Sequence, residues 1–182
     1  MLTLELVLLA FTPWSAPRHC ASRALRSQCS PRAALDEPHA RLVLVRHGQS
    51  EWNRANRFTG WVDVDLTEQG IAEAREAGRL LAADGVALDE VHTSFMRRAI
   101  RSAVLMLSTL NQCWVPVHKN PSLNEQHSGM MTGQNKYDLA QEYGPDQVMA
   151  WRRKYDEEPP QIEQALAPTR RTAPDARYTL QH

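Results

Sequence analysis

Polar side chains that can bind an anion follow the predicted strands of this chain. Arg46 and His47 come directly after the apolar run RLVLV, and Arg97 and Arg98 come shortly after a second predicted strand. Both of these later arginines fall in the first turn of a predicted helix. Amide N–H groups at a helix N-terminus and guanidinium groups can share one bound anion. The residues therefore predict an anion site beside His47.

Three short strands must position these groups. The run at residues 41–45 is almost entirely apolar without alternation, which is typical of a parallel strand buried on both faces. Further strands are predicted at residues 90–93 and 114–117. Ligands of parallel sheets bind outside the carboxyl ends of the strands. We therefore expect Asn124 and Glu125, in the loop beyond the third strand, to lie at the same edge as His47.

Two amphipathic helices are predicted between the strands. The first has small or apolar residues at positions 71, 74, 78 and 81, with Thr67 as its N-cap and Gly85 as its end. The second has apolar residues at positions 96, 100, 103, 107 and 110, and we expect Ser94 to cap it. The alternation of strand and helix predicts an α/β fold with a mostly parallel sheet.

Composition excludes several classes of protein. The 182 residues suit about one domain, and 42% of them are hydrophobic, enough for a packed core. Lys+Arg and Asp+Glu are both 21, and this balance argues against a nucleic-acid partner. No apolar run approaches the ~18–20 residues of a membrane span, so we expect no membrane partner. Three cysteines, two of them before residue 30, do not form a disulfide scaffold.

The first forty residues differ in kind from the rest. A short apolar run at residues 2–11 is followed by a stretch with four arginines and four serines, and no acidic residue occurs between positions 6 and 35. This composition is typical of transit peptides. We expect a targeting leader over residues 1–40, with a plastid favoured over a mitochondrion. The alternative is a disordered extension on a cytosolic protein.

A longer pattern surrounds His47. Residues 42–53 read LVLVRHGQSEWN and residues 58–64 read FTGWVDV, and shorter matches occur at 93–94, 98–100, 123–125 and 151–153. Over residues 41–162 the chain resembles cofactor-dependent phosphoglycerate mutases of the histidine phosphatase superfamily. The resemblance implies a three-layer phosphoglycerate-mutase-like fold whose C-terminal part is missing here. It also implies a small phosphorylated substrate, 2,3-bisphosphoglycerate as phosphoryl donor, and no metal.

The resemblance also implies roles for individual residues. His47 would accept a phosphoryl group on one ring nitrogen, while a backbone carbonyl orients the other. Arg46 and Arg98 would clamp that phosphoryl group, and Glu125 would donate and accept the proton of the substrate hydroxyl. The positions implied to hold the substrate are Gln49, Ser50, Asn53, Thr59, Gly60, Gln126, His127, Ser128, Lys136, Arg152 and Arg153.

Other residues that could carry chemistry are expected to be structural. We expect Trp52, Trp61 and Trp151 to pack rather than to contact a cofactor. The spacing of His118 and His127 fits no metal motif, and the implied chemistry needs no metal.

The chain departs from the family pattern in two places. Family members carry a second catalytic histidine in a His-Gly pair after a C-terminal strand, and His182 is the only histidine here beyond His127. We therefore expect the strand at residues 41–45 to have an open edge and exposed apolar side chains. The family usually has Arg and Tyr, which touch substrate, where Gln126 and Ser128 stand.

These observations give three hypotheses for function. The first is a phosphoglycerate mutase of glycolysis and gluconeogenesis, which interconverts 3- and 2-phosphoglycerate through a phosphohistidine at His47. The second is a histidine-type phosphatase, in which water takes the phosphoryl group. The third is a non-catalytic, truncated fragment of the mutase family. We interpret residues 41–162 as an incomplete domain and residues 163–182 as an irregular tail, and the resemblance is compatible with a homodimer.

Overall fold

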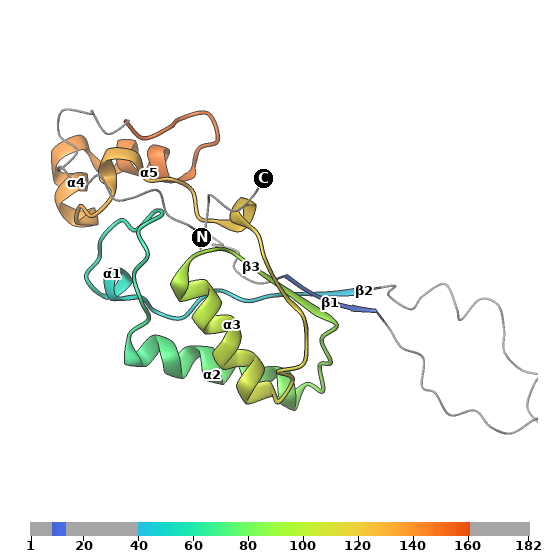
Figure 1. Ribbon diagram of the computed structural model, residues 1–182. Helices are drawn as coiled ribbons and strands as arrows, with labels where there is room; N and C mark the ends of the chain where they lie inside the picture. Colours follow the sequence, from blue (N-terminus) through green and yellow to red (C-terminus); the bar gives the residue numbers. More distant parts are fainter. Residues whose placement is uncertain (1–8, 14–39, 161–182) are drawn as a thin grey trace, which may run out of the picture.

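The computed structural model describes residues 9–13 and 40–160. Within them, one sheet has the strand order β2-β1-β3-β4. Its strands are β1 (Leu9–Pro13), β2 (Ala40–Leu44), β3 (Glu90–Thr93) and β4 (Val117–Lys119). β3 and β4 are parallel, and β1 is antiparallel to both β2 and β3. β2, β3 and β4 therefore run in the same direction, which confirms the predicted α/β fold with a mostly parallel sheet (Figure 1).

β1 lies in the part of the chain that we assigned to a leader and left out of the fold. Its five residues pair with all five residues of β2, and residues 9–11 also pair with residues 90–92 of β3. One edge of β2 is therefore hydrogen-bonded, and β2 is the end strand of the described sheet. The rest of the predicted leader, like most of the predicted irregular tail, lies outside the described residues.

Helices α2 (Glu68–Ala83) and α3 (Arg97–Leu110) pack against each other on one side of the sheet (Figure 1). They approach closely at Gly78, where a Cβ atom would lie 2.5 Å from the carbonyl oxygen of Met106. Thr67 caps α2 by accepting from the Gly70 N–H, as predicted. The core of this region comprises Val86, Leu88, Val91, Ala103, Met106, Leu107, Leu110 and Val115.

The prediction that the first strand is buried on both faces is wrong. Val43 and Val45 pack on the core, but Leu42 and Leu44 are 51% and 44% exposed. The reason is that α2 and α3 cover the same face of the described sheet. The exposed leucines agree with the apolar side chains expected to be uncovered along this strand.

The third strand begins later than predicted, at Val117 rather than at Trp114. Trp114 is 75% exposed, and Val115 turns into the core from an irregular segment. Pro116 has no N–H to donate to a ladder, and its carbonyl accepts from the Val91 N–H. Regular pairing with β3 therefore starts only after the proline.

The remaining elements are small helices. They are α1 (Glu51–Arg54), η2 (Pro121–Leu123), η3 (Gly129–Met131), α4 (Lys136–Tyr143) and α5 (Pro145–Arg153). α4 and α5 lie beyond α1, away from α2 (Figure 1). A second apolar cluster joins α4 and α5; it comprises Phe58, Met131, Leu139 and Val148, with Trp151 packed on it. In the described part of the chain, no helix has the length and apolar character needed to cross a membrane.

Candidate active site

His47 lies in the loop after β2, and two helices hold this loop. The Gly48 N–H donates to Ser102 Oγ of α3 at 3.1 Å, and the Ser102 hydroxyl donates to the Arg98 carbonyl at 2.8 Å. On the other side the loop rests on α2, because a Cβ atom at Gly48 would lie 2.1 Å from the Gly70 carbonyl oxygen. Only glycine allows this approach, and it leaves His47 7% exposed in a defined position.

The imidazole of His47 has a defined tautomer. Its Nδ1 lies 2.7 Å from the carbonyl oxygen of Gly48. A carbonyl oxygen can only accept, so Nδ1 carries the proton of this hydrogen bond. In the neutral ring, Nε2 then holds the lone pair that can attack an electrophile. This geometry agrees with the backbone contact that the resemblance implies.

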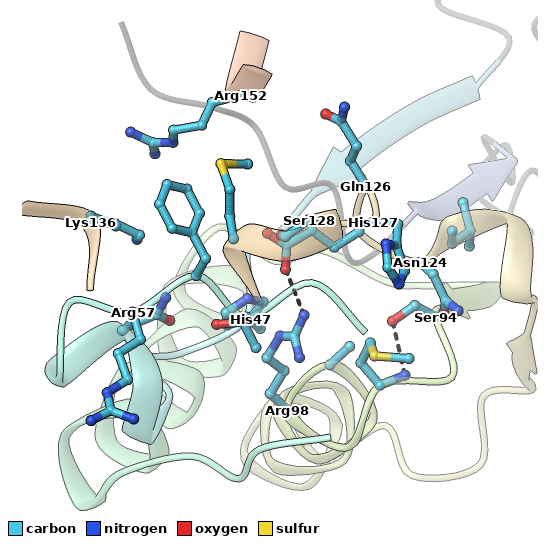
Figure 2. Close-up of a pocket in the computed structure, with 18 of the residues that line it drawn as sticks. His47, Arg57, Ser94, Arg98, Asn124, Gln126, His127, Ser128, Lys136 and Arg152 are labelled. Atoms are coloured by element: carbon cyan, nitrogen blue, oxygen red, sulfur yellow. Dashed lines mark hydrogen bonds and ion pairs between the residues drawn. The ribbon is translucent and has the colours of Figure 1, made fainter. Parts of the chain in front are cut away.

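Arg98 is a buried cation next to His47 at the cavity. It is 2% exposed, and its guanidinium donates to the carbonyl oxygens of Gly60 and Val62, each at 3.1 Å. The same guanidinium donates to Glu125 Oε2 at 2.7 Å, and the Glu125 side chain is 22% exposed. Figure 2 shows the Arg98 guanidinium directed toward the cavity. The dashed line from this guanidinium marks its contact with the Glu125 carboxylate. The predicted convergence of Arg98, His47 and Glu125 at one edge of the sheet is present in the structure.

The N-terminus of α3 is capped differently from the prediction. Met96, not Ser94, is the N-cap residue, and the Ser94 hydroxyl accepts from the Met96 N–H at 3.3 Å. The Arg97 N–H donates instead to Asp63 Oδ1 at 2.6 Å. A carboxylate from a distant loop therefore takes the place of a local hydroxyl at this helix end, where negative charge is favourable.

An ion pair also connects the same loop to α3. Arg101 Nη1 lies 2.7 Å from Asp65 Oδ2. The side-chain hydrogen bond from Arg101 lowers the pKa of Asp65 below its usual value of 3.8. Both carboxylates of the loop, Asp63 and Asp65, thus contact α3 on the side of its first turns.

These groups border a cavity of about 360 Å³ that is rich in cations. Among the residues that the structure describes, four cations line it, Arg57, Arg98, Lys136 and Arg152, together with one carboxylate, that of Glu125. Lys136 and Arg152 come from α4 and α5 on one side, while His47 and Arg98 lie on the other (Figure 2). The excess of positive side chains suits a ligand with several negative charges.

Phe58 supports two of these cations. The Lys136 ammonium lies 5.6 Å from the centre of its ring, and the Arg152 guanidinium lies 5.7 Å away. Contacts of this kind are favourable because the face of an aromatic ring is electron-rich. Phe58 itself is buried in the cluster that holds α4 and α5, so the ring couples the cations to the packing of that region.

Most, but not all, of the residues implied by the resemblance border the cavity. Those that line it are His47, Asn53, Thr59, Arg98, Glu125, Gln126, His127, Ser128, Lys136 and Arg152. Those outside its lining are Arg46, Gln49, Ser50, Gly60 and Arg153.

Three of the residues outside the lining make structural contacts instead. The Gln49 side chain accepts from the Thr67 hydroxyl at 2.9 Å, next to α2. Ser50 is fully buried and caps α1 in a capping box with Asn53, which does line the cavity. Gly60 contributes its carbonyl oxygen to Arg98 rather than a surface to the cavity.

Sequence reasoning missed several residues of the site, of which Arg57, Trp151 and Trp61 are examples. Arg57 lines the cavity, and its position directly before the motif FTGWVDV was the only available signal. Trp151, expected only to pack, also lines it. Trp61, likewise expected to pack, donates from its indole nitrogen to the Glu125 carbonyl at 2.6 Å. Among the described residues, no group of three His, Cys, Asp or Glu side chains could hold a metal ion.

The fold and the site together define a histidine-centred anion site at the edge of an α/β sheet. The chain matches the model of the Histidine phosphatase superfamily (branch 1) over residues 42–180. It belongs to this superfamily.

Two curated relatives narrow the comparison. The chain is 52% identical over 124 residues to the 2,3-bisphosphoglycerate-dependent phosphoglycerate mutase of Cutibacterium acnes, covering 68% of this chain and 50% of that protein. It is 52% identical over 123 residues to the protein of the same name from Corynebacterium diphtheriae, with the same two coverages. The chain therefore spans about half the length of the curated relatives it matches.

A solved structure provides a second comparison. The alpha-ribazole phosphatase from Shigella flexneri is 33% identical to this chain, with a TM-score of 0.51. The match covers 64% of this chain and 55% of that one. The fold of this chain is therefore similar to that of a phosphatase, while its sequence is similar to those of two mutases.

Proposed function

We propose that this chain carries the phosphoryl-transfer site of a 2,3-bisphosphoglycerate-dependent phosphoglycerate mutase, with His47 as the nucleophile. The observation that carries the proposal is the position of His47, with its proton on Nδ1, beside the buried Arg98 at a cation-lined cavity. The 52% identity to two mutases supports the choice of substrate. The reaction is the interconversion of 3-phosphoglycerate and 2-phosphoglycerate.

The proposed reaction moves one proton from the C2 hydroxyl to the C3 oxygen and leaves Glu125 and His47 as they began. The Glu125 carboxylate takes the proton of the C2 hydroxyl of 3-phosphoglycerate, and that oxygen attacks the phosphorus of phosphorylated His47. The N–P bond breaks, and its electron pair returns to Nε2. In the second transfer the lone pair of Nε2 attacks the phosphorus on the C3 oxygen. The P–O bond breaks, its electron pair stays on the C3 oxygen, and Glu125 gives that oxygen its proton.

Arg98 would stabilise the charge of the phosphoryl group during both transfers. Its guanidinium already faces the cavity and is held by two backbone carbonyls, so little reorganisation is needed. In the structure the guanidinium also donates a hydrogen bond to the Glu125 carboxylate. Phosphoryl oxygens compete for the same N–H groups, so binding of substrate would release Glu125 for proton transfer.

The residues fit 2,3-bisphosphoglycerate, which when bound supplies the phosphoryl group that loads His47. This molecule has two phosphate groups and a carboxylate, and four cationic side chains line the cavity. A volume of about 360 Å³ falls within the usual range for small-molecule sites. Lys136 and Arg152 would hold the anionic groups that do not react, because they lie on the other side of the cavity from His47.

A histidine-type phosphatase is the second candidate. Two observations favour it: the match to a phosphatase structure, and Gln126 and Ser128 at cavity positions where mutases usually have Arg and Tyr. Both residues are neutral here, so they would hold the phosphoglycerate less tightly and leave room for water. His47 would be loaded in the same way, and water would then attack the phosphorylated ring. The third candidate, a non-catalytic fragment, predicts no loading of His47.

One experiment separates the three candidates. The full chain is incubated with 2,3-bisphosphoglycerate, and its mass is measured at neutral pH and after acid treatment. We expect an acid-labile phosphoryl adduct that is lost in His47→Ala, because a phosphohistidine hydrolyses in acid. Conversion of 3-phosphoglycerate into 2-phosphoglycerate indicates the mutase, whereas release of inorganic phosphate alone indicates the phosphatase. An adduct that persists in His47→Ala would contradict the assignment of the nucleophile.

We also propose that residues 1–40 direct the protein to an organelle, with a plastid favoured. The support is the apolar start followed by an arginine- and serine-rich, acid-free stretch. Residues 1–40 fused to a fluorescent protein should direct it to plastids in cells that contain them. A diffuse cytosolic signal would contradict the proposal.

A further inference from the structure

Glu125 lies in a segment with no regular secondary structure. Residues 125–128, between η2 and η3, form neither helix nor strand, so the backbone of Glu125 is not fixed by a regular pattern of hydrogen bonds. Side chains from other elements contact it instead. Arg98 donates to its carboxylate at 2.7 Å, and the indole Nε1–H of Trp61 donates to its backbone carbonyl at 2.6 Å.

Trp61 is also connected to Arg98 through its two neighbours in the chain. The carbonyl oxygens of Gly60 and Val62 each accept from the Arg98 guanidinium at 3.1 Å. The segment of residues 60–62 thus holds both partners of the ion pair. Its carbonyls hold the arginine, and its indole holds the glutamate. The contacts form a closed ring, in which loss of the indole N–H would loosen the position of Glu125 relative to Arg98.

Further contacts join the same two segments. The rings of Trp61 and His127 meet edge to face, with centroids 5.9 Å apart. Gly60, with a φ of +49°, comes so close that a Cβ atom there would lie 3.0 Å from Ser128 Oγ. Trp61 is nevertheless 44% exposed, so burial of the ring is a small part of what it contributes. Its specific feature is the short hydrogen bond to Glu125.

We propose that Trp61 is a positioning residue for Glu125: its indole N–H holds the loop so that the carboxyl group stays at the cavity next to Arg98, also when phosphoryl oxygens replace it on the guanidinium. This inference rests on the proposed function, in which Glu125 transfers the proton. The role differs from the packing that we expected for this tryptophan.

A residue that positions a proton donor has a kinetic signature that a merely structural residue lacks. In loading of His47, the P–O bond breaks and its electron pair goes to the leaving oxygen. The alkoxide that leaves 2,3-bisphosphoglycerate needs a proton, which Glu125 takes up from water and passes on, whereas the weakly basic oxygen of 4-nitrophenyl phosphate departs without it. General acid catalysis typically contributes ~10²–10⁴-fold. We expect Trp61→Phe to slow loading by ~10-fold with 2,3-bisphosphoglycerate and by less than ~2-fold with 4-nitrophenyl phosphate.

The test uses the full chain and the variants Trp61→Phe, Glu125→Gln and Trp114→Phe. Trp114→Phe is the matched control, because this tryptophan is 75% exposed and follows the C-terminal end of α3, far along the helix from Arg98. The first measurement is amide hydrogen exchange over residues 126–131, which requires no activity. We expect exchange to become about tenfold faster in Trp61→Phe, as for the loss of one hydrogen bond, and to stay unchanged in Trp114→Phe.

The second measurement is the rate of adduct formation with the two phosphate esters. Glu125→Gln sets the pattern for loss of the proton donor, and Trp61→Phe should reproduce it with a smaller loss. Equal losses with both esters, or unchanged exchange in Trp61→Phe, would overturn the inference. If the unmodified chain forms no adduct with either ester, the proposed function fails. Hydrogen exchange then decides by itself whether Trp61 holds the Glu125 loop.

Discussion

Arg97 and Arg98 are adjacent arginines in the first turn of α3, and replacing each by alanine tests the role of the buried one. Arg98 is 2% exposed and donates to two backbone carbonyls and to Glu125. The Arg97 side chain is 59% exposed, and its guanidinium lies 3.8 Å from Asp63. The two substitutions remove the same atoms from neighbouring positions of one helix, so helix propensity and net charge change equally.

The effect on stability follows from what each side chain leaves behind. Arg98→Ala removes the guanidinium donors from the Gly60 and Val62 carbonyls and from the Glu125 carboxylate. A buried acceptor that loses its partner costs ~1–3 kcal/mol, and a broken buried ion pair costs ~3–5 kcal/mol. Water can reach Glu125, whose side chain is 22% exposed, so we expect a total of ~2–4 kcal/mol. Arg97→Ala should cost less than ~0.5 kcal/mol, as for a surface pair.

The effect on phosphoryl transfer is of similar size but has a different cause. Removing one preorganised donor typically costs ~3 kcal/mol of transition-state stabilisation, which corresponds to ~150-fold in rate. Loading of His47 by 2,3-bisphosphoglycerate should therefore be ~150-fold slower in Arg98→Ala and nearly unchanged in Arg97→Ala. Arg98→Lys keeps the charge but lacks the planar fork, so it should fall between the two.

Urea unfolding measures the first effect, and the rate of adduct formation measures the second. Arg98→Lys keeps the rate test valid if Arg98→Ala does not fold. Equal losses of stability in the two alanine variants would show that burial and hydrogen bonding of Arg98 do not govern its contribution. Loading at the normal rate in a folded Arg98 variant would refute the phosphate clamp.

Three further predictions concern the elements that position the site. Gly48→Ala should lower the free energy of unfolding by ~1–3 kcal/mol, measured in urea, because its Cβ would overlap the Gly70 carbonyl; an unchanged midpoint would contradict this. Asp65→Asn should cost less than ~1 kcal/mol near neutral pH. Because Arg101 lowers the pKa of Asp65, this contribution is complete above the usual value of 3.8 and is lost as pH falls through the lowered pKa, so the variant and the unmodified chain should converge in acid. A loss that persists there would contradict the linkage. Deletion of residues 1–39 removes β1 and its pairing with β2 and β3, and should lower stability by ~2–4 kcal/mol; equal urea midpoints would show that β1 contributes nothing.

Much of the fold could be predicted because its signals are local. The spacing of apolar residues and the Thr67 cap placed α2 correctly, and the same periodicity located α3. The burial of β2 could not be predicted in this way. A continuous apolar run indicates a strand, but which faces are covered depends on where distant helices pack, and here they cover one face.

The site shows the same division. His47, Arg98 and Glu125 could be brought together on paper because the carboxyl ends of parallel strands share an edge. The contacts that orient them could not, because they join loops that are distant in sequence and have no period. The cap of α3 is one example, since Asp63 replaces the nearby Ser94. The carbonyls that hold Arg98 are another example, because every residue has a backbone carbonyl and the residue type does not show which one accepts.

One loop determines how the three functional groups work together. Residues 60–63 hold the Arg98 guanidinium, the Glu125 loop and the N-terminus of α3. A guanidinium held by carbonyls keeps its orientation whether or not an anion is bound. Its N–H groups that face the cavity can therefore exchange a carboxylate acceptor for phosphoryl oxygens while the guanidinium stays in place. In the proposed mechanism, binding of the anion and release of Glu125 are then one event. Because this proposed exchange precedes the choice of acceptor, it would be the same in a mutase and in a phosphatase, and the neutral cavity residues Gln126 and Ser128 would then favour hydroxyl or water.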